Sequence, residues 1–442
     1  MLFLTGCTGL IALDEDPTPA FTSPSGGYVV VFEEWDVPET ALAGIQAAGG
    51  EIVHALPQIG VVFVRATDPE FPARVAGLAG VEEVGPNKAH TLPPVEVVKT
   101  IKPEQQDIED NLFYVWYQWD IKRVGGVEDT WAVETGDGVT VAVLDTGVDY
   151  LHIDIAPNYA YGYSYIDPAD LPPGYTLVEL GDERDYLGHG THVAGSIAAP
   201  ITEGAIIGVA PGAKIANYKV LAAIQDPDGD VRGMGWDSWI IPAIMDAADD
   251  GCQVINMSLG GDYDLSNPED LAGFLAYCRA TQYAWEKGTL VVAAAGNDGE
   301  DLSQGPIRHS PSATPHALSV SATGPFDELA VYSNYGAFTA DFAGPGGNIP
   351  DEEYPGWWED YLCFSSVYFD GTYHWYGWMA GTSMAAPKVT GVAALVYAHN
   401  PGIGPAGVVR VLERSADDIG APGYDFEFGW GLVNAYRAIV GP

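Results

Sequence analysis

The stretch Gly381-Thr382-Ser383-Met384-Ala385-Ala386-Pro387 is the most informative part of the chain, because it puts a serine at a predicted strand-to-helix turn. The apolar run that follows is typical of a buried helix over 383–399. Pro387 falls in the first turn or so of that helix, where a missing N–H is tolerated. A serine held at such a turn is a candidate nucleophile, and it needs a positioned histidine because its free hydroxyl is a poor one.

Two further stretches provide a base and a carboxylate. Val139–Asp145 reads as a buried strand that ends on an acid, and Gly188–Gly195 reads as a glycine-rich turn entering a small-residue helix that contains His189. The order Asp, His, Ser is one of three unrelated chain orders that build the same catalytic triad. The sequence therefore predicts Asp145, His189 and Ser383 as catalytic residues.

These blocks resemble the subtilisin-like serine peptidases, the subtilases of peptidase family S8. The resemblance rests on Asp145-Thr146-Gly147, His189-Gly190-Thr191-His192 and Gly381–Ala385, and on Ala293-Ala294-Ala295-Gly296-Asn297, which is similar to the family's oxyanion segment. It covers roughly residues 120–440. It implies a serine endopeptidase that works through an acyl-enzyme with no cofactor for catalysis, and an amide of Asn297 that binds the developing oxyanion.

Each catalytic residue has a plainer interpretation when taken alone. Asp145 could end a strand in a turn, His189 could cap a helix, and Ser383 could be an N-cap, since serine is favoured there. Together they favour catalysis, because capping does not predict an Asp, a His and an Asn in matching contexts. His192 is interpreted as a packing residue, because a zinc-peptidase helix would also carry a glutamate.

Strands and helices alternate after Trp131, which predicts an α/β fold with a mostly parallel sheet. The resemblance implies a subtilisin-like three-layer sandwich over residues 121–442. Strands are expected at 139–145, 214–221, 253–257, 289–294 and 318–322, and helices at 189–199, 238–250, 268–287, 383–399 and 404–414.

A smaller unit is predicted over residues 26–92, in the order β-α-β-β-α-β. Its strands are expected at 28–32, 52–56, 61–66 and 81–86 and its helices at 38–48 and 70–79. This order resembles the ferredoxin-like, inhibitor I9-like propeptide of subtilases. The resemblance implies an intramolecular inhibitor whose C-terminal tail fills the cleft until self-cleavage. Residues 93–120, which open with Pro93-Pro94, are predicted to be the linker with the processing region.

Substrate binding is assigned by the resemblance to Ser258-Leu259-Gly260 and, more loosely, to Gly233-Met234-Gly235. An extended peptide that adds a strand beside such segments gains backbone hydrogen bonds that tolerate many sequences. The alternative for the first segment is a simple glycine-rich loop after a strand. The expected partners are therefore protein or peptide substrates.

Three features depart from the family pattern. Lys388 stands where relatives commonly have histidine, and His152-Ile153-Asp154 replaces His-Pro-Asp. The segment 346–379 is long and rich in Trp and Tyr, and it either shapes a specificity pocket or buries its own rings as an insertion. The second interpretation is favoured.

Charge is the other conspicuous property. The net charge is −43, with 17 acidic against 5 basic residues in 1–115 and 44 against 13 in the remainder. An excess spread along the whole chain argues against nucleic-acid binding, which needs a basic face. It suggests a saline or calcium-rich habitat, and we expect stability and activity to change between very low and molar salt.

Asp226-Pro227-Asp228-Gly229-Asp230 is the best local metal candidate, with Asp226, Asp228 and Asp230 as oxygen ligands of the kind that calcium requires. The segment lacks the later glutamate of an EF-hand, and aspartate and glycine also favour turns, which is the preferred interpretation. The family resemblance makes structural calcium an expectation without naming its ligands.

The amino terminus, residues 1–25, is interpreted as a signal remnant and tether. Leu4-Thr5-Gly6-Cys7 resembles a bacterial lipobox with Cys7 as the lipidated residue, although only six residues precede it. Either the true start lies upstream, which is favoured, or Cys7 is incidental. The expected location is secreted or cell-envelope, with a lipid anchor if Cys7 is modified. The remaining Cys252, Cys278 and Cys363 define no disulfide framework.

Two rival functions stay open at this stage. One is a catalytically inactive subtilase that acts as a binding or chaperone module. The other is a hydrolase of another class, which the missing Gly-x-Ser-x-Gly elbow around Ser383 argues against. A monomer is expected.

Overall fold

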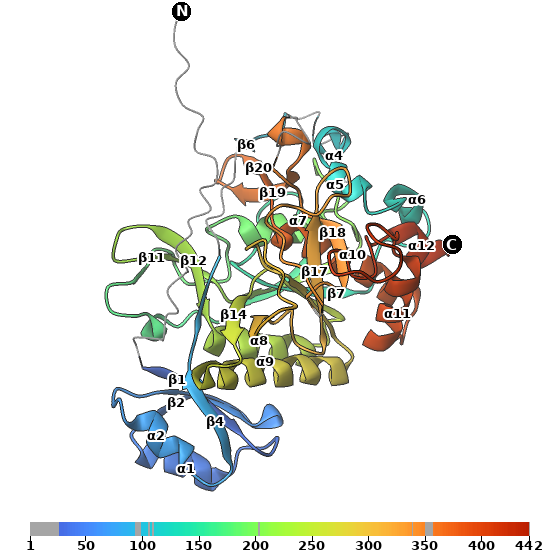
Figure 1. Cartoon of the computed structure of the whole chain (residues 1–442). Helices are drawn as coiled ribbons and strands as arrows, with labels where there is room; N and C mark the ends of the chain where they lie inside the picture. The colour runs from blue at the N-terminus through green and yellow to red at the C-terminus, as the bar shows by residue number, and fades with distance from the viewer. Residues whose placement is uncertain are drawn as a thin grey trace, which may run out of the picture.

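The computed structural model describes residues 26–92, 99–104, 107, 110–201, 204–337, 339–349 and 357–441. Cys7 and the rest of the predicted tether, 1–25, lie outside these residues. Figure 1 shows a small N-terminal unit, drawn in blue, packed against a larger α/β unit.

The larger unit is built on a seven-stranded parallel sheet. The strand order is β18-β17-β15-β13-β7-β10-β8. The strands are β7 Thr140–Asp145, β8 Tyr159–Ser164, β10 Lys214–Lys219, β13 Val254–Met257, β15 Leu290–Ala294, β17 Ala317–Thr323 and β18 Phe342–Pro345. Most are continuous apolar runs, as strands buried on both faces require. The predicted parallel α/β fold is confirmed, with β8 and β18 added at the edges.

Helices cover both faces of this sheet. They are α7 His189–Ala198, α8 Asp237–Asp249, α9 Pro268–Lys287, α10 Thr382–His399, α11 Pro405–Ser415 and α12 Ala435–Val440. Side chains of β7 alternate between two cores: Val141 and Val143 pack with α7 and α10, whereas Ala142 and Leu144 pack with α8 and α9. The predicted three layers are therefore present.

The small unit pairs four antiparallel strands in the order β2-β3-β1-β4. Its elements are β1 Gly27–Phe32, α1 Glu39–Ala47, β2 Glu51–Leu56, β3 Val61–Arg65, α2 Phe71–Ala76 and β4 Val81–Pro86. One face of the sheet packs on α1 and α2. The other face, with Val29 and Phe63, joins the core formed by α8 and α9. From α9, Arg279 donates hydrogen bonds to the carbonyls of Phe32 at 2.8 Å and Ile59 at 3.0 Å.

The chain that joins the two units is partly structured. The small unit, residues 26–92, ends with β5 (Ala89–Thr91), and in the joining chain β6 (Thr100–Ile101) is followed by α4 Leu112–Tyr117, α5 Trp119–Lys122 and α6 Val127–Trp131. Phe113 and Tyr114 of α4 are buried against the larger unit. The last third of the predicted linker 93–120 therefore packs with the larger unit, because its aromatic side chains are buried in the hydrophobic core of that unit.

The aromatic segment before the predicted nucleophile forms a hairpin of β19 (Cys363–Phe369) and β20 (His374–Met379). The rings of Phe364, Tyr376 and Trp378 are buried, with Phe364 and Trp378 4.4 Å apart between ring centroids. They pack with Phe113 of α4. The burial of Phe364, Tyr376 and Trp378 agrees with the favoured interpretation of the segment 346–379 as an insertion that buries its own aromatic rings.

Lys388, in the first half of α10, forms a fully buried ion pair. Its Nζ lies 2.6 Å from Asp120 Oδ2 in α5. Burial alone would lower the pKa of Lys388, but the charge of Asp120 raises the pKa above its ordinary value, so the ammonium is retained. The pair ties α5, at the end of the predicted linker 93–120, to α10.

Replacement of Lys388 by methionine is expected to lower the free energy of unfolding by about 3–5 kcal/mol, because it leaves Asp120 buried and uncompensated. Urea unfolding measured in a Ser383→Ala background, which prevents self-digestion, tests this. The double variant Lys388→Met with Asp120→Leu should recover most of the loss. Equal stability of the Lys388→Met single variant and the parent would contradict the role of the pair.

Candidate active site

Asp145 and His189 meet at the carboxyl edge of the sheet. Asp145 is the last residue of β7 and His189 is the first of α7. His189 Nδ1 lies 2.7 Å from Asp145 Oδ1, and both side chains are buried. Burial alone would lower the pKa of His189, but the charge and hydrogen bond of Asp145 raise the pKa above its usual value. The carboxylate therefore orients the imidazole and stabilises its protonated form.

Asp185 holds the two segments in register, and sequence reasoning missed it. Its Oδ1 accepts a hydrogen bond from Thr146 Oγ1 at 2.9 Å, while its Oδ2 accepts from Thr191 N and Oγ1 at 2.9 and 2.7 Å. Thr146 follows Asp145, and Thr191 lies two residues after His189. Asp185 is thus a positioning residue, and an acid just before the Gly188 turn was the available signal.

Ser383 lies at the start of α10 and is 6% exposed. Its Oγ donates to the carbonyl of Ser258 at 3.2 Å, and Ser258 Oγ donates to the carbonyl of Ser383 at 2.7 Å. Among the described residues no hydrogen bond joins Ser383 Oγ to His189. Such bonds between nucleophile and base are often long without substrate and tighten in the Michaelis complex.

Asn297 is oriented by the residue that precedes the serine. Its Oδ1 accepts from Thr382 N at 2.8 Å and from Thr382 Oγ1 at 2.9 Å. Because both bonds use the oxygen, the Nδ2 amide is left to donate elsewhere. Asp145 ends β7, and Ser258 and Asn297 come after the carboxyl ends of the neighbouring strands β13 and β15. This is the edge where open parallel sheets bind ligands.

Asn297→Ala is expected to lower kcat by about 10²–10³ with little change in KM, because the lost donor acts on charge that develops only in the transition state. Steady-state hydrolysis of a peptide substrate measures both constants. Asn297→Asp is the matched variant, since it keeps an acceptor for Thr382 but has no donor. A nearly unchanged kcat in either variant would rule out this role.

An extended segment of the small unit lies between the two predicted substrate-binding stretches. β5 pairs antiparallel with β12 (Val231–Trp236), with His90 opposite Gly235 and Leu92 N donating to Gly233 O at 2.8 Å. On the other side, the His90 ring reaches Gly261, where an added Cβ would lie 2.3 Å from Nδ1. Thus Gly233-Met234-Gly235 and the segment after Ser258-Leu259-Gly260 both flank one bound strand.

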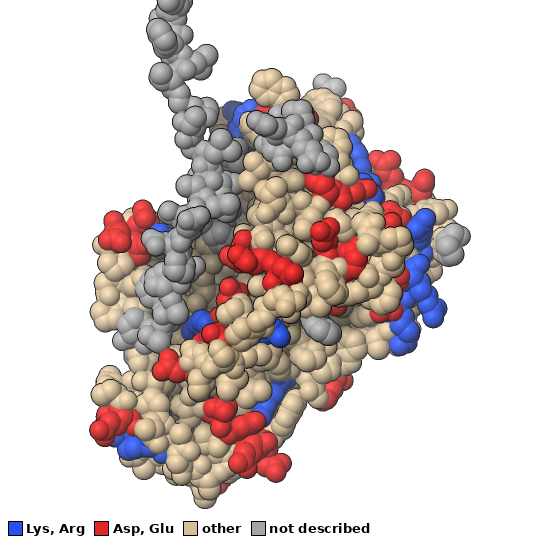
Figure 2. All heavy atoms as spheres, viewed as in Figure 1, with Lys and Arg blue, Asp and Glu red and all other residues tan. Residues whose placement is uncertain are grey.

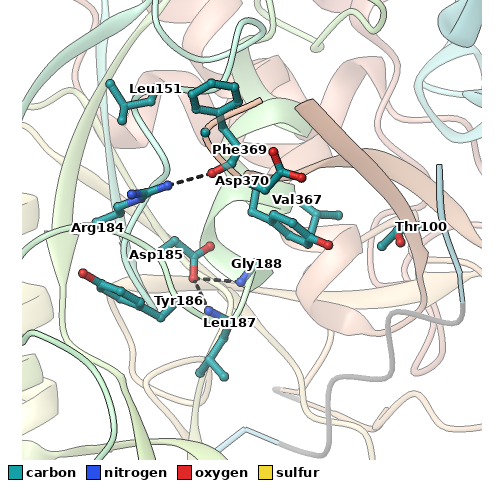
Figure 3. Close-up of a pocket in the computed structure, with 12 residues that line it drawn as sticks. Thr100, Leu151, Arg184, Asp185, Tyr186, Leu187, Gly188, Val367, Phe369 and Asp370 are labelled. Carbon is teal, nitrogen blue, oxygen red and sulfur yellow. Dashed lines mark hydrogen bonds between the residues drawn. The ribbon is translucent and has the colours of Figure 1, made fainter. Parts of the chain in front are cut away.

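A cavity of about 490 Å³ opens beside the turn that leads into His189 (Figure 3). The turn Asp185–Gly188 forms one side, Val367–Gly371 of the hairpin forms another, and Thr100 of β6 lies at the edge. β6 pairs antiparallel with β20, with Thr100 opposite Gly377. Thr100, which follows the stretch 93–98, therefore lies beside this turn, whereas Leu92, which precedes the stretch, bonds to β12.

The acidic metal candidate has the contacts of a turn in this structure. Asp226 Oδ1 accepts from the amides of Asp228 and Asp230 at 3.0 and 2.9 Å, as in an ordinary turn. Carboxylates of Asp226 and Asp230 both face Arg232 at 3.6 Å. Within the described ranges, the three-residue grouping with converging ligand atoms is instead Asp262, Asp298 and His309.

Charge and cysteine placement add two observations. Figure 2 shows acidic side chains at many separate places over the visible face rather than in one patch. In the part of the chain that the structure describes, Cys252, Cys278 and Cys363 are free thiols. Over the same residues, every helix is too short or too polar to span a membrane.

Known proteins are similar to this chain in sequence and in fold. The model of the subtilase family matches residues 136–431. A thermophilic serine proteinase of Bacillus sp. (strain AK1) is 34% identical over 334 residues, which are 75% of this chain and 69% of that protein. Thermitase of Thermoactinomyces vulgaris is 33% identical over 70% of this chain and 91% of its own. The crystal structure of fervidolysin from Fervidobacterium pennivorans, described as a keratinolytic enzyme related to subtilisin, has a TM-score of 0.70 at 27% identity and covers 96% of this chain and 62% of that one.

Proposed function

Because the chain belongs to the subtilase family and is a serine-type endopeptidase, we propose that Asp145, His189 and Ser383 are its triad and that it matures by cutting itself. The main support is the buried pair of Asp145 and His189, whose Oδ1 and Nδ1 atoms lie 2.7 Å apart at the carboxyl edge of the sheet. Ser258, at the same edge, donates a hydrogen bond to the carbonyl of Ser383. The substrates are proteins or peptides, and catalysis uses no cofactor.

In the reaction, Ser383 Oγ attacks the peptide carbonyl while His189 takes its proton. Asp145 holds the imidazole tautomer and stabilises the imidazolium. The Nδ2 amide of Asn297 and the backbone N–H of Ser383 stabilise the tetrahedral oxyanion. His189 then protonates the leaving amine, and water hydrolyses the acyl-enzyme. Ser258-Leu259-Gly260 supplies backbone contacts to the extended substrate.

Residues 26–92 act as an intramolecular inhibitor in this proposal. The support is that Ala89–Leu92 forms a strand on β12 at the position where an extended substrate would add to the cleft. The processing bond lies between Leu92 and Thr100, because Leu92 still bonds to Gly233 of β12 while Thr100 already lines the cavity beside the turn before His189. This narrows the processing region within residues 93–120 to its first part.

The proposal places the enzyme outside the cytoplasm, either secreted or on the cell envelope. Cys7 is the candidate for lipidation, and its sequence context Leu4–Cys7 is the support. Labelling with a radioactive fatty acid in a bacterial host tests this, with Cys7→Ala as the control. Protein that stays unlabelled when a bacterial lipoprotein signal is fused ahead of Leu4–Cys7 would remove the anchor from the proposal.

The test of function follows intact mass over time in residues 21–442, alongside casein hydrolysis. We expect loss of the chain up to a bond between Leu92 and Thr100, and onset of hydrolysis with that loss. A fluorophosphonate should block hydrolysis and label the peptide that contains Ser383.

A folded protein that stays full length, does not hydrolyse casein and does not react with the fluorophosphonate would favour the rival function, an inactive subtilase that binds partners. Cleavage of short-chain esters without casein would favour a dedicated esterase. A cut outside 92–100 would overturn the position of the processing bond but not the activity.

A further inference from the structure

His90, in the middle of β5, inserts its ring into a closed polar pocket. The ring is 3% exposed, and Asp237, Tyr263 and Tyr277 around it are at most 1% exposed. His90 Nε2 lies 2.6 Å from Asp237 Oδ1, 3.2 Å from Tyr277 Oη and 3.3 Å from Tyr263 Oη. The pocket therefore contacts the histidine chiefly through one ring nitrogen.

Asp237 is held in this pocket by donors from several elements. It is the first residue of α8, whose N-terminus favours negative charge. Tyr263, on β14 (Gly261–Asp264), donates to Oδ1 at 2.7 Å, and Lys88 N donates to Oδ2 at 3.0 Å. Burial first, and then the charge of Asp237, raises the pKa of Tyr263 and of Tyr277 well above the usual value. Both hydroxyls thus stay protonated and can donate.

The shape of the pocket fits a flat ring with one donor. A Cβ on Gly261 would lie 2.3 Å from His90 Nδ1, so a larger residue there would strike the ring. His90 Nδ1 is buried without a hydrogen-bond partner, whereas Nε2 faces Asp237. An imidazole with its hydrogen on Nε2 meets these contacts, since Nε2–H can donate to the carboxylate.

Two of the contacts to Asp237, from His90 and from Lys88 N, belong to the small unit. When residues up to the processing bond leave, the carboxylate keeps Tyr263 from the larger unit but loses those two donors. A substrate strand that takes the place of β5 covers Asp237 again. An apolar substrate side chain at the His90 position would bury the Asp237 carboxylate without supplying a donor to it. Burying an acceptor in this way costs free energy, so such a substrate should bind less well.

We propose that Asp237, Tyr263 and Tyr277 form a substrate pocket that selects histidine, or another side chain ending in a nitrogen donor, at the position that His90 occupies. The substrates are peptides with such a residue at the position of His90. This position is two residues before the one that bonds to Gly233, which is Leu92 in the uncut chain. The inference rests on the proposed function, because it takes β5 to occupy the path of the substrate.

The test uses self-processed enzyme from the full chain and peptides that copy residues 86–102, with mass spectrometry of the products. The histidine at position 90 is kept or replaced by lysine, alanine, leucine or glutamate. We expect kcat/KM to fall about 10- to 100-fold for alanine and leucine, further for glutamate, and least for lysine. A Thr91→Ala peptide is the matched control, because Thr91 is partly exposed and lies outside the pocket.

The enzyme variant Asp237→Leu is expected to reverse the order, so that the leucine peptide is cut faster than the histidine peptide. Equal rates for the histidine, alanine and leucine peptides with an enzyme that hydrolyses casein would overturn the pocket and leave the proposed function standing. Failure to cut casein or any peptide would instead contradict the proposed function.

A second measurement tests the pocket without catalysis. In the full chain with Ser383→Ala, His90→Ala should speed hydrogen exchange of the Leu92 amide at least about 10-fold, because β5 loses its anchor while the amide is bonded only to Gly233 O. Thr91→Ala should change the exchange rate far less. Equal exchange in the His90→Ala and parent chains would overturn the pocket as the anchor of β5.

Discussion

The full-length chain carrying Ser383→Ala is expected to stay intact while the wild type cuts itself between Leu92 and Thr100. The self-cleavage rate should fall by about 10⁶, since the nucleophile of a triad acts as a unit with its base. Because the reaction is intramolecular, retained inhibition by the small unit does not confound the measurement. Intact mass over several days gives the rate.

Ser415→Ala is the matched control, because Ser415 is equally buried in a helix but only bonds the carbonyl of Leu412. It should mature at the wild-type rate. A trace of wild-type enzyme should cut the Ser383→Ala chain at the same bond. The cut Ser383→Ala protein should still not hydrolyse casein. Self-cleavage of purified Ser383→Ala at more than a hundredth of the wild-type rate would mean that another group attacks the bond.

Asp145→Asn is expected to lower kcat by about 10⁴, because an asparagine that donates to His189 Nδ1 selects the wrong imidazole tautomer. The side chain is nearly isosteric and Asp145 is fully buried, so the fold should be retained. Self-cleavage rate and peptide hydrolysis both report the loss. Thermal unfolding in the Ser383→Ala background confirms that the loss is not a folding defect.

The pH dependence provides an independent check on the same pair. His189 must be neutral to accept a proton, so activity should rise with pH through its raised pKa, above the usual 6.5. The charge of Asp145 helps to raise the pKa of His189, so Asp145→Asn should lower that pKa. The midpoint of the activity–pH curve should then move to lower pH. Asp149→Asn is the control, because Asp149 contacts Arg184 and Phe369 N but not His189. An unmoved midpoint in Asp145→Asn would contradict the electrostatic role.

The central elements of the fold were predictable because their residues carry strong local signals. The β-branched run of β7 and the small apolar residues of α10 read as buried elements without any tertiary information. α9 was predicted at its observed bounds, since Asn267 caps its start and Gly288, at φ 96°, ends it. Tyr159–Ser164, in β8, was missed because it mixes aromatic, glycine and serine residues on a sheet edge.

Contacts that form only when distant segments meet were not predictable. His90 and Asp237 are 147 positions apart, and neither lies in a motif. The ion pair between Lys388 and Asp120 is similarly hidden, because the sequence shows only an unusual lysine. By contrast, the expected roles of Asp145, His189, Ser383 and Asn297 came from short motifs, and they remain predictions until the variants are measured.

The position of β5 has a consequence for when activity appears. In the proposed function, β5 (Ala89–Thr91) is a tethered ligand of the cleft while the chain is uncut, at an effective concentration of the order of millimolar. In the proposed maturation, the released piece competes after the cut only at its actual concentration, and it is held by the contacts of Arg279 and His90. Dilution alone then shifts the equilibrium toward an open cleft. At the high concentration near its site of synthesis, the enzyme would stay inhibited by the released piece. It would become active when it is diluted into a larger volume.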